Sequence, residues 1–385
     1  MPEKIRILFA IGSLGGGGAE RALVDQMKRI DRSRFIPALY LVENQGEFLS
    51  ELPDDVPLFA FSDRQQLPVV NWPGRIHGQL VKDMAAVIQE QKIDIVFDQT
   101  FHMTLIAGPA TEKTSTARVS LVVCDPESNF INNETRFQRL KRRALKHAYQ
   151  TADKVVAVSD GVRNAVINFF DVDPANIITH YYSIDFDRID RLAAHADVQL
   201  QPGLFHVVSC GRLHDQKGYP YLIEAADQLI HREGYQDLRF HILGEGPRRD
   251  ELTAMIQEKQ LTEHIILAGF QSNPFQFYRQ AQLFCFPSLY EGMPNALLEA
   301  LASKIPVVSA DCPSGPREIL DDGKYGRLVP IRDSSALAAA IADAVRHHEQ
   351  WQSIVPAARQ RIEELFGYEQ GMQQLEEILI DATAR

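Results

Sequence analysis

The sequence of 385 residues has few cysteines, no excess of basic residues and no long apolar run. None of its four cysteines forms a C-x-x-C pair with another. This pattern argues against a disulfide framework and a cysteine zinc site, and it predicts buried thiols in a reducing compartment. The cysteines are Cys124, Cys210, Cys285 and Cys312.

The lack of long apolar segments bears on where the protein works. No run approaches the roughly 20 residues that a membrane-spanning helix needs. The first residues, from Met1 to Ile5, lead directly into a strand-like run without the features of a secretory signal peptide. We therefore expect a cytoplasmic protein, peripheral at the membrane if it meets one. The formal net charge of −11 argues against nucleic acid as a partner.

What the sequence does contain is two series of short apolar runs that alternate with helical patterns. This βα alternation predicts parallel sheets covered by helices on both faces. The polar segment 184–203 between the series predicts a linker. We predict two doubly wound, Rossmann-like α/β domains facing across a cleft, over residues 1–195 and 203–366. The runs are 5–11, 36–42, 57–61, 93–97, 118–124, 154–158 and 177–181, then 205–210, 238–243, 265–267, 283–286, 307–309 and 327–329.

A glycine-rich loop, GSLGGGGAE at 12–20, follows the first predicted strand and opens the first predicted helix. Glycines let the backbone approach a ligand closely, and the N-terminus of a helix attracts an anion. The G-x-G-x-x-G spacing of a dinucleotide site is missing, and the acid near the end of the second strand, Glu43, comes late. An NAD site is therefore disfavoured, and a flexible turn is the other interpretation.

Two loops of the second domain carry charges after predicted strands. Arg212 and Lys217 follow the first of these strands, and a forked guanidinium with a point-charge ammonium suits a diphosphate. Glu291 and Glu299 flank a Gly-Met-Pro-Asn turn that opens a helix, whose N–H groups can hold phosphate or sugar oxygens. Glu299, in the second helical turn, suits two vicinal hydroxyls. The alternative is solvated surface charge.

The motif GRLxxQKG at 211–218, the pair Glu291-x7-Glu299 and the early glycine-rich loop, in the family's order, resemble glycosyltransferase family four. The resemblance spans the chain from Ile5 to the final helix. It implies a GT-B fold whose C-terminal helix, at about 368–385, crosses back to the first domain. It also implies transfer of a hexose or N-acetylhexosamine from a nucleotide sugar, with retention of configuration. The stretch DCPSGPREIL at 311–320 resembles the branch that builds bacterial surface glycans, such as lipopolysaccharide, from UDP-sugars on glycan or polyprenyl-linked acceptors.

By this resemblance, Arg212 and Lys217 hold the donor diphosphate, Glu291 addresses the transferred sugar and Glu299 binds the ribose. The first three are the implied catalytic residues. The other donor contacts fall on the glycine-rich loop, on strand-ending turns and on the turn before Glu299. They are Gly16, Gly17, Gly211, Gly244, Gly269, Phe270, Gly292, Met293, Pro294 and Asn295.

The sequence departs from the family in the first domain. Many members carry a His after the strand that matches 118–124, in contact with the reacting sugar. Here the loop reads CDPESN, which leaves Asp125, Glu127 and the earlier His102 as candidates for the acceptor and sugar side. In the family the leaving phosphate takes the acceptor's proton, so we expect no metal or other cofactor. An Asp-x-Asp pattern at Asp185 and Asp187 falls in the predicted linker, and we discount it as a metal site.

A basic helix is predicted at 136–147, with four cations on one face. Such a face attracts anionic lipid head groups, which suits a lipid-linked acceptor, whereas a solvated face is the alternative. Two other functions fit the fold: a nucleotide-sugar epimerase and an inactive glycan-binding relative. The intact cations and carboxylates of the second domain argue against both. The four cations are Arg139, Arg142, Arg143 and Lys146.

Overall fold

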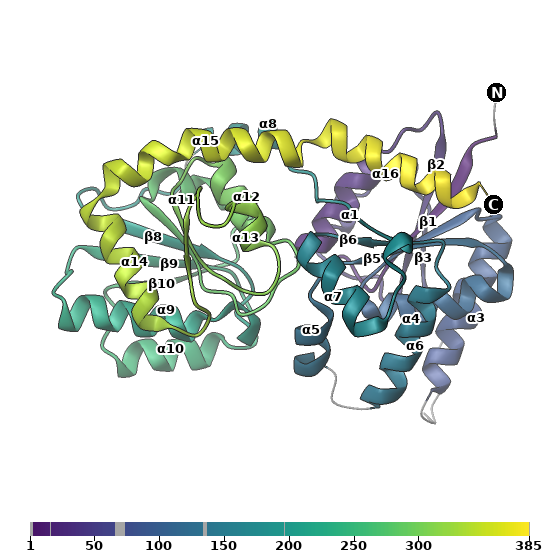
Figure 1. Cartoon of the computed structure of the whole chain (residues 1–385), viewed down its shortest axis with the longest axis horizontal. Helices are drawn as coiled ribbons and strands as arrows, with labels where there is room; N and C mark the ends of the chain where they lie inside the picture. The colour runs from purple at the N-terminus through teal and green to yellow at the C-terminus, as the bar shows by residue number, and fades with distance from the viewer. Residues whose placement is uncertain (1–2, 16, 66–73, 134–136, 196, 385) are drawn as a thin grey trace. The chain divides into compact units, whose positions relative to one another are not determined.

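The computed structural model describes residues 3–15, 17–65, 74–133, 137–195 and 197–384. It divides into two compact units (Figure 1). Unit one comprises residues 1–183 and 369–385, and unit two comprises 184–368. Each unit has one parallel sheet with helices on both faces, so the predicted pair of doubly wound α/β folds is confirmed.

The sheet of unit one has the strand order β3-β2-β1-β4-β5-β6-β7. In β1 every residue from Ile7 to Ile11 is buried, as expected for a central parallel strand covered on both faces. After β1 the chain adds β2 and β3 toward one edge of the sheet, and after β4 it adds β5, β6 and β7 toward the other, so the strand order reverses between β1 and β4. Ligands of such sheets bind at this switch point, beyond the carboxyl ends of the strands. The strands are β1 (Ile5–Ile11), β2 (Phe35–Leu41), β3 (Leu58–Ala60), β4 (Ile95–Gln99), β5 (Ala117–Val122), β6 (Lys154–Ala157) and β7 (Ile177–Thr179).

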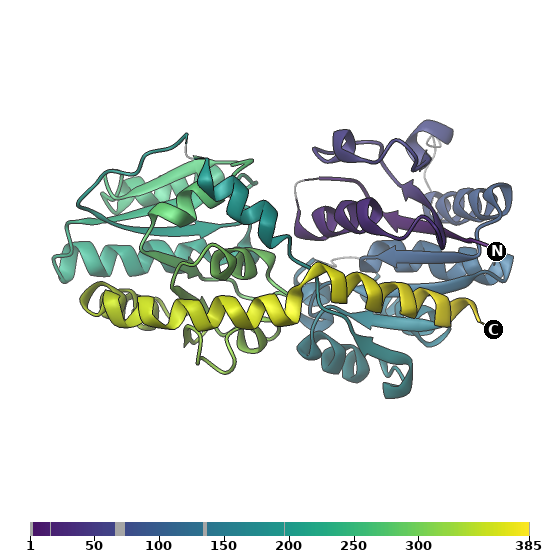
Figure 2. The same ribbon diagram turned by 90° about the horizontal axis from the view of Figure 1, so that it is seen from above.

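The helices of unit one cover both faces of this sheet (Figure 1). Helix α4 packs between α3 and α6, and the apolar faces of α3 and α4 share a core with β1, β2 and β4. Helices α1 and α16 lie over the opposite face (Figures 1 and 2). The helices are α1 (Gly18–Arg29), α2 (Phe61–Arg64), α3 (Arg75–Gln91), α4 (Phe101–Thr114), α5 (Pro126–Asn133), α6 (Gln138–Gln150), α7 (Asp160–Phe170) and α16 (Tyr368–Thr383).

The C-terminal helix α16 returns to unit one, as predicted. Its Glu376 accepts a hydrogen bond from the backbone N–H of Asp31, at 2.9 Å, and one from the guanidinium of Arg34, at 3.2 Å. The ring of His180 and the side-chain amide of Gln374 are 3.0 Å apart. These contacts tie the last helix to the chain segments beside α1 and β7.

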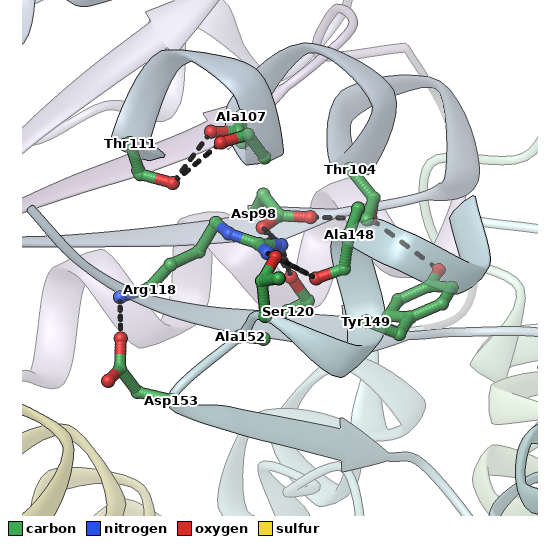
Figure 3. A network of polar contacts seen from close by, with 12 residues as sticks. Asp98, Thr104, Ala107, Thr111, Arg118, Ser120, Ala148, Tyr149, Ala152 and Asp153 are labelled. Atoms are coloured by element: carbon green, nitrogen blue, oxygen red, sulfur yellow. Dashed lines mark hydrogen bonds and ion pairs between the residues drawn. The ribbon is translucent and has the colours of Figure 1, made fainter. Parts of the chain in front are cut away.

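A buried polar network joins four elements of unit one (Figure 3). Asp98, at the end of β4, is fully buried and accepts hydrogen bonds from Thr104 of α4, at 2.6 Å, and Ser120 of β5, at 2.7 Å. The guanidinium of Arg118 lies 3.7 Å from the same carboxylate and donates to Ser120 and to the carbonyl of Ala148 in α6. The network therefore fixes α4 and α6 to β4 and β5.

The sheet of unit two has the order β10-β9-β8-β11-β12-β13, again all parallel. Helices α9, α10 and α14 pack together on one face, and α8, α11, α12 and α15 lie on the other (Figure 1). The strands are β8 (Phe205–Cys210), β9 (Leu238–Leu243), β10 (Ile265–Gly269), β11 (Leu283–Phe286), β12 (Val307–Ala310) and β13 (Arg327–Val329). The helices are α8 (Phe186–Ala194), α9 (Tyr219–Asp227), α10 (Arg249–Glu258), α11 (Phe275–Gln280), α12 (Asn295–Ala302), α13 (Pro316–Ile319), α14 (Ser334–Arg346) and α15 (His348–Phe366).

The segment predicted as a linker contains helix α8 instead. Asp185 caps this helix by accepting from the N–H of Arg188 at 2.8 Å, which gives that carboxylate a structural role. Ile189 and Ala193 are buried, and α8 packs against α11 and α12. Residues 184–195, which we assigned to the first domain, therefore belong to unit two.

Candidate active site

The switch point of unit two lies between β8 and β11. After β8 the chain builds β9 and β10 on one side, and after β11 it builds β12 and β13 on the other. The loops that follow β8 and β11 diverge from this point, where doubly wound sheets bind ligands. These loops carry Arg212 and Lys217 after β8 and Glu291 after β11.

The two loops are packed closely because glycines leave room between them. Gly218 has φ +65°, and a Cβ there would lie 2.1 Å from the carbonyl oxygen of Pro287. Gln216 joins the loops by two hydrogen bonds: its amide donates to the carbonyl of Tyr290 at 2.8 Å, and its backbone carbonyl accepts from Leu289 at 2.7 Å. The loops therefore form one structure, although they are far apart in sequence.

Lys217 and Glu291 form an ion pair across these loops. Lys217 Nζ lies 2.6 Å from Glu291 Oε1, with the two side chains 17% and 10% exposed. The ammonium also lies 5.4 Å from the centre of the Phe286 ring. Gly211 makes room for the lysine stem, since a Cβ there would lie 3.1 Å from Lys217 Cε. The pair is thus held in a mostly desolvated position.

Arg212 differs from Lys217 in its surroundings. It is exposed, and its guanidinium makes no ion pair or side-chain hydrogen bond with any residue that the structure describes. Of the two predicted diphosphate ligands, one is already neutralised by a carboxylate and the other is open to solvent. Both lie on the loop that leaves β8.

The turn before α12 packs against a second turn, which contains Gly315. Gly292, Met293 and Pro294 are buried. Gly315 has φ +92°, and a Cβ there would lie 2.4 Å from Pro294 Cδ and 2.9 Å from the carbonyl oxygen of Gly292. A glycine at this position therefore lets the two turns touch. The partly buried Asn295 begins α12, and Glu299 follows in its second turn.

Glu299 affects two groups near the carboxyl end of β8, the half-buried Cys210 of that strand and the buried Tyr278 of α11. It raises the pKa of the Cys210 thiol, although burial is the main cause and brings that pKa to about 11. It also contributes to raising the pKa of Tyr278, where burial again dominates. The Glu299 carboxylate is therefore near enough to the end of β8 to act on Cys210, and its role in binding the ribose stays a prediction.

The predicted contacts on β9 and β10 come together at the same edge of the sheet. The N–H of Gly244 donates to the carbonyl of Gly269 at 2.8 Å. Gly244 has φ +143° and touches the backbone of Gly211, where a Cβ would lie 2.1 Å from the carbonyl oxygen. Phe270 is 50% exposed. The ends of β8, β9 and β10 are therefore joined by glycine contacts.

The first-domain candidates lie on unit one. Gly17 is the N-cap of α1, whereas Gly16 lies outside the described residues. His102, in the first turn of α4, is exposed. Asp125 is 6% exposed and accepts from the N–H of Ser128 at 2.7 Å, at the start of α5. Glu127 is exposed. The choice among His102, Asp125 and Glu127 stays a prediction.

The structure changes the predicted basic stripe on α6. Arg142 donates to the carbonyl of Phe169 at 2.9 Å, and Lys146 lies 2.8 Å from a carboxylate oxygen of Asp171. These two cations turn to the neighbouring helix α7 and its end, because α6 packs against α7. Two of the four cations are therefore engaged by α7 and its end. Arg139, Arg142 and Arg143 are exposed, and Lys146 is partly buried.

Two residues that support the site were not among the predicted site residues. Gln216 ties the loops, and Gly315 supports the turn before α12. Gln216 lies inside the GRLxxQKG motif, so the motif marked its position. The motif could not show that the side chain bonds to the loop after β11. In the described part of the chain, no group of three or more His, Cys, Asp and Glu side chains is arranged to hold a metal ion. Each helix in the described ranges is too short or too polar to span a bilayer.

Comparison with known proteins decides the family. The family described as "Glycosyltransferase Family 4" matches residues 16–188, and "Glycosyl transferases group 1" matches 205–347. A Campylobacter jejuni enzyme is 34% identical over 331 residues, which cover 85% of this chain and 86% of that protein. It is named N-acetylgalactosamine-N,N'-diacetylbacillosaminyl-diphospho-undecaprenol 4-alpha-N-acetylgalactosaminyltransferase. The chain belongs to glycosyltransferase family four.

Solved structures agree on the fold of this glycosyltransferase. Anabaena HepE, solved in complex with UDP and glucose, superposes with a TM-score of 0.80 at 22% identity, over 97% of this chain and 99% of that one. The sucrose-phosphate synthase of Thermosynechococcus elongatus gives 0.81 at 15% identity, over 97% and 98%. Both likenesses show the GT-B fold. The alternative of a nucleotide-sugar epimerase finds no support in these matches.

Proposed function

We propose that this glycosyltransferase moves a hexose or N-acetylhexosamine from a UDP-sugar to a glycan or polyprenyl-linked acceptor in surface-glycan synthesis, with retention of configuration. The Campylobacter jejuni relative supports the lipid-linked acceptor and the N-acetylhexosamine, because its name contains both. The UDP in the Anabaena HepE structure supports the nucleotide. The observation that carries the proposal is the convergence of two cations and two carboxylates at the switch point of unit two.

The chemistry follows from these charges. As the bond between sugar and diphosphate breaks, negative charge grows on the leaving phosphate. Arg212 and Lys217, with the N–H groups at the start of α12, stabilise that charge. Glu299 accepts from the ribose hydroxyls, and Glu291 accepts from the transferred sugar. The leaving phosphate takes the proton of the acceptor hydroxyl.

We propose that no metal cofactor takes part. Two cations on one loop supply the positive charge that a divalent ion supplies in other transferases. Turnover that persists in excess EDTA would support this proposal. Turnover that EDTA abolishes and Mg²⁺ or Mn²⁺ restores would contradict it.

Transfer to a defined acceptor tests the proposed function. The protein is mixed with UDP-glucose, UDP-N-acetylglucosamine or UDP-N-acetylgalactosamine and a short glycan on a polyprenyl diphosphate. We expect one donor to extend the acceptor, and NMR coupling constants to show an α linkage from the α-configured donor. A β linkage would contradict retention. The absence of any product from UDP-sugars, with extension from a GDP- or ADP-sugar, would contradict the choice of nucleotide.

We also propose that α6 brings unit one to an anionic membrane surface. Two large apolar side chains are exposed at the start of this helix, Phe137 at 61% and Leu140 at 67%. They lie beside the exposed cations Arg139 and Arg143. Apolar groups that enter the interface, next to cations that meet lipid phosphates, are typical of helices that lie on a membrane.

A further inference from the structure

The ion pair between Lys217 and Glu291 joins two residues to which the reaction gives separate tasks. Lys217 is to hold the diphosphate and Glu291 the sugar, yet in this structure each is the partner of the other, at 2.6 Å. Arg212, on the same loop, has no such partner among the described residues. Before the donor binds, the charge of Lys217 is therefore already paired with a carboxylate, whereas the charge of Arg212 is not.

Binding a diphosphate at Lys217 places like charges close together. The phosphate oxygens must come within hydrogen-bond distance of Nζ, and Glu291 Oε1 already occupies that distance. Both side chains are largely shielded from water, at 17% and 10% exposure, so repulsion between phosphate and carboxylate is weakly screened. When the Lys217 ammonium is shared by the carboxylate and the phosphate, it stabilises each anion less than it would stabilise either one alone.

An intact donor relieves this conflict, whereas the nucleotide product does not. The sugar of the donor brings hydroxyl groups that donate to the Glu291 carboxylate when Lys217 turns to the diphosphate. UDP alone brings the diphosphate without the hydroxyls, and it leaves the buried carboxylate uncompensated. A buried anion without a partner costs free energy.

We propose that the Lys217–Glu291 pair is a counter-ion exchange device that favours the intact donor over UDP and promotes product release. Glu291 holds Lys217 in the free protein, and the diphosphate replaces it when the donor binds. The freed carboxylate then accepts from the sugar. Once the sugar has left, Glu291 competes with UDP for the ammonium and weakens its binding. This inference rests on the proposed function.

The exchange predicts opposite effects for two glutamates of one motif. Glu291→Gln removes the competing charge and retains the shape of the side chain, so UDP should bind roughly tenfold more tightly. Glu299→Gln is the matched control: it makes the same change eight residues later, at a carboxylate expected to bind the ribose, and it should weaken UDP. Glu291→Asp retains the charge and should bind UDP no more tightly than the parent does.

Calorimetric titration of the full-length protein with UDP, and with the UDP-sugar that it uses, tests the exchange. The ratio of the Kd for UDP to the Kd for the UDP-sugar should fall in Glu291→Gln, together with a lower kcat. UDP affinity in folded Glu291→Gln that equals or falls below the parent's would overturn the inference. If that variant does not fold, Glu291→Ser, which also removes the carboxylate and keeps Lys217, replaces it, and its UDP affinity should exceed the parent's. A folded Glu291→Ser variant that binds UDP no better than the parent would overturn the exchange.

The same titration separates this inference from the proposed function. A parent protein that binds none of UDP, GDP and ADP would overturn both. A parent that binds UDP, together with a Glu291→Gln variant that does not bind it more tightly, would overturn the exchange alone.

Discussion

The two cations at the switch point, Arg212 and Lys217, contribute differently to the stability of the folded protein. Arg212 is exposed and unpaired among the described residues, so the folded state gains little from it. Lys217 compensates a carboxylate that is 10% exposed. Removing one partner of a shielded pair leaves the other charge without compensation, which destabilises a protein more than losing a solvated charge does. The two residues therefore share a proposed function but not a structural role.

Alanine substitutions should separate these roles. We expect Arg212→Ala and Lys217→Ala each to lower kcat/KM by roughly 10²-fold or more, since each removes a group that stabilises the departing diphosphate. Only Lys217→Ala should also lower Tm, because Glu291 is left unpaired. Steady-state kinetics and thermal unfolding of both variants measure this. Activity of a folded variant within a few-fold of the parent's would contradict the assigned role.

A buried histidine pair gives unit two a pH dependence. His241 is 7% exposed, and its ring lies 2.9 Å from that of His206, whose other nitrogen donates to the carbonyl of Gln201 at 2.8 Å. Burial, with a smaller effect of His206, lowers the pKa of His241 from 6.5 to about 4. The unfolded chain therefore binds a proton at higher pH than the folded one. This contribution to stability is complete above pH 6.5 and is lost as the pH falls toward 4.

Urea unfolding of the parent and of His241→Gln between pH 7.5 and 4 measures this contribution. Carboxylates titrate in both proteins, so the comparison isolates the histidine. The free energy of unfolding should fall more steeply below pH 6.5 in the parent than in the variant. Parallel curves would show that His241 does not contribute.

At the scale of elements, packing decides what a charge pattern means. The periodicity of α6 predicted one face of four cations, but α7 lies against two of them. The polar segment before β8 predicted a linker, because its Asp and Arg residues outnumber the apolar residues Ile189 and Ala193, which α8 buries. The helices that pack against α6 and α8 cannot be identified from the residue spacing within either segment.

Helix α6 should bind anionic vesicles through its outward side. Arg139→Glu/Arg143→Glu should greatly reduce co-sedimentation with vesicles rich in phosphatidylglycerol at low salt, since each cation contributes about 1 kcal/mol near such a surface. Phe137→Ser/Leu140→Ser should reduce binding at low and high salt alike. The control Lys304→Glu/Arg332→Glu makes the same charge change at exposed positions of unit two. Equal sedimentation of parent and α6 variants would make this helix a solvated face.

The network that joins α4 and α6 to the sheet should be sensitive to loss of its cation (Figure 3). Arg118 is 2% exposed and lies 3.7 Å from the carboxylate of Asp98. Arg118→Met leaves that carboxylate buried without a counter-charge and should cost about 3–5 kcal/mol of unfolding free energy. Adding Asp98→Asn should restore part of the loss. A cost below about 1 kcal/mol in urea unfolding would contradict a stabilising role for the pair.

For the whole molecule, sequence periodicity predicted most of the fold and part of the site. Buried parallel strands are continuous apolar runs, so both sheets were visible in the sequence. The residues at the ends of β8 and β11 were visible as motifs. Their pairing was not, because Lys217 and Glu291 are 74 positions apart and meet only when the two strands become neighbours. The contact of Gly315 with Pro294 was hidden for the same reason.

We propose above all that the charges at the switch point of unit two activate a UDP-sugar. Release of UDP from UDP-sugars by slow hydrolysis measures this directly, because it needs no acceptor. With EDTA present, the parent should release UDP from at least one UDP-sugar faster than from GDP- or ADP-sugars, and folded Arg212→Ala should lose roughly 10²-fold of that rate. Equal rates in the parent and Arg212→Ala, or no release from any UDP-sugar, would contradict the account.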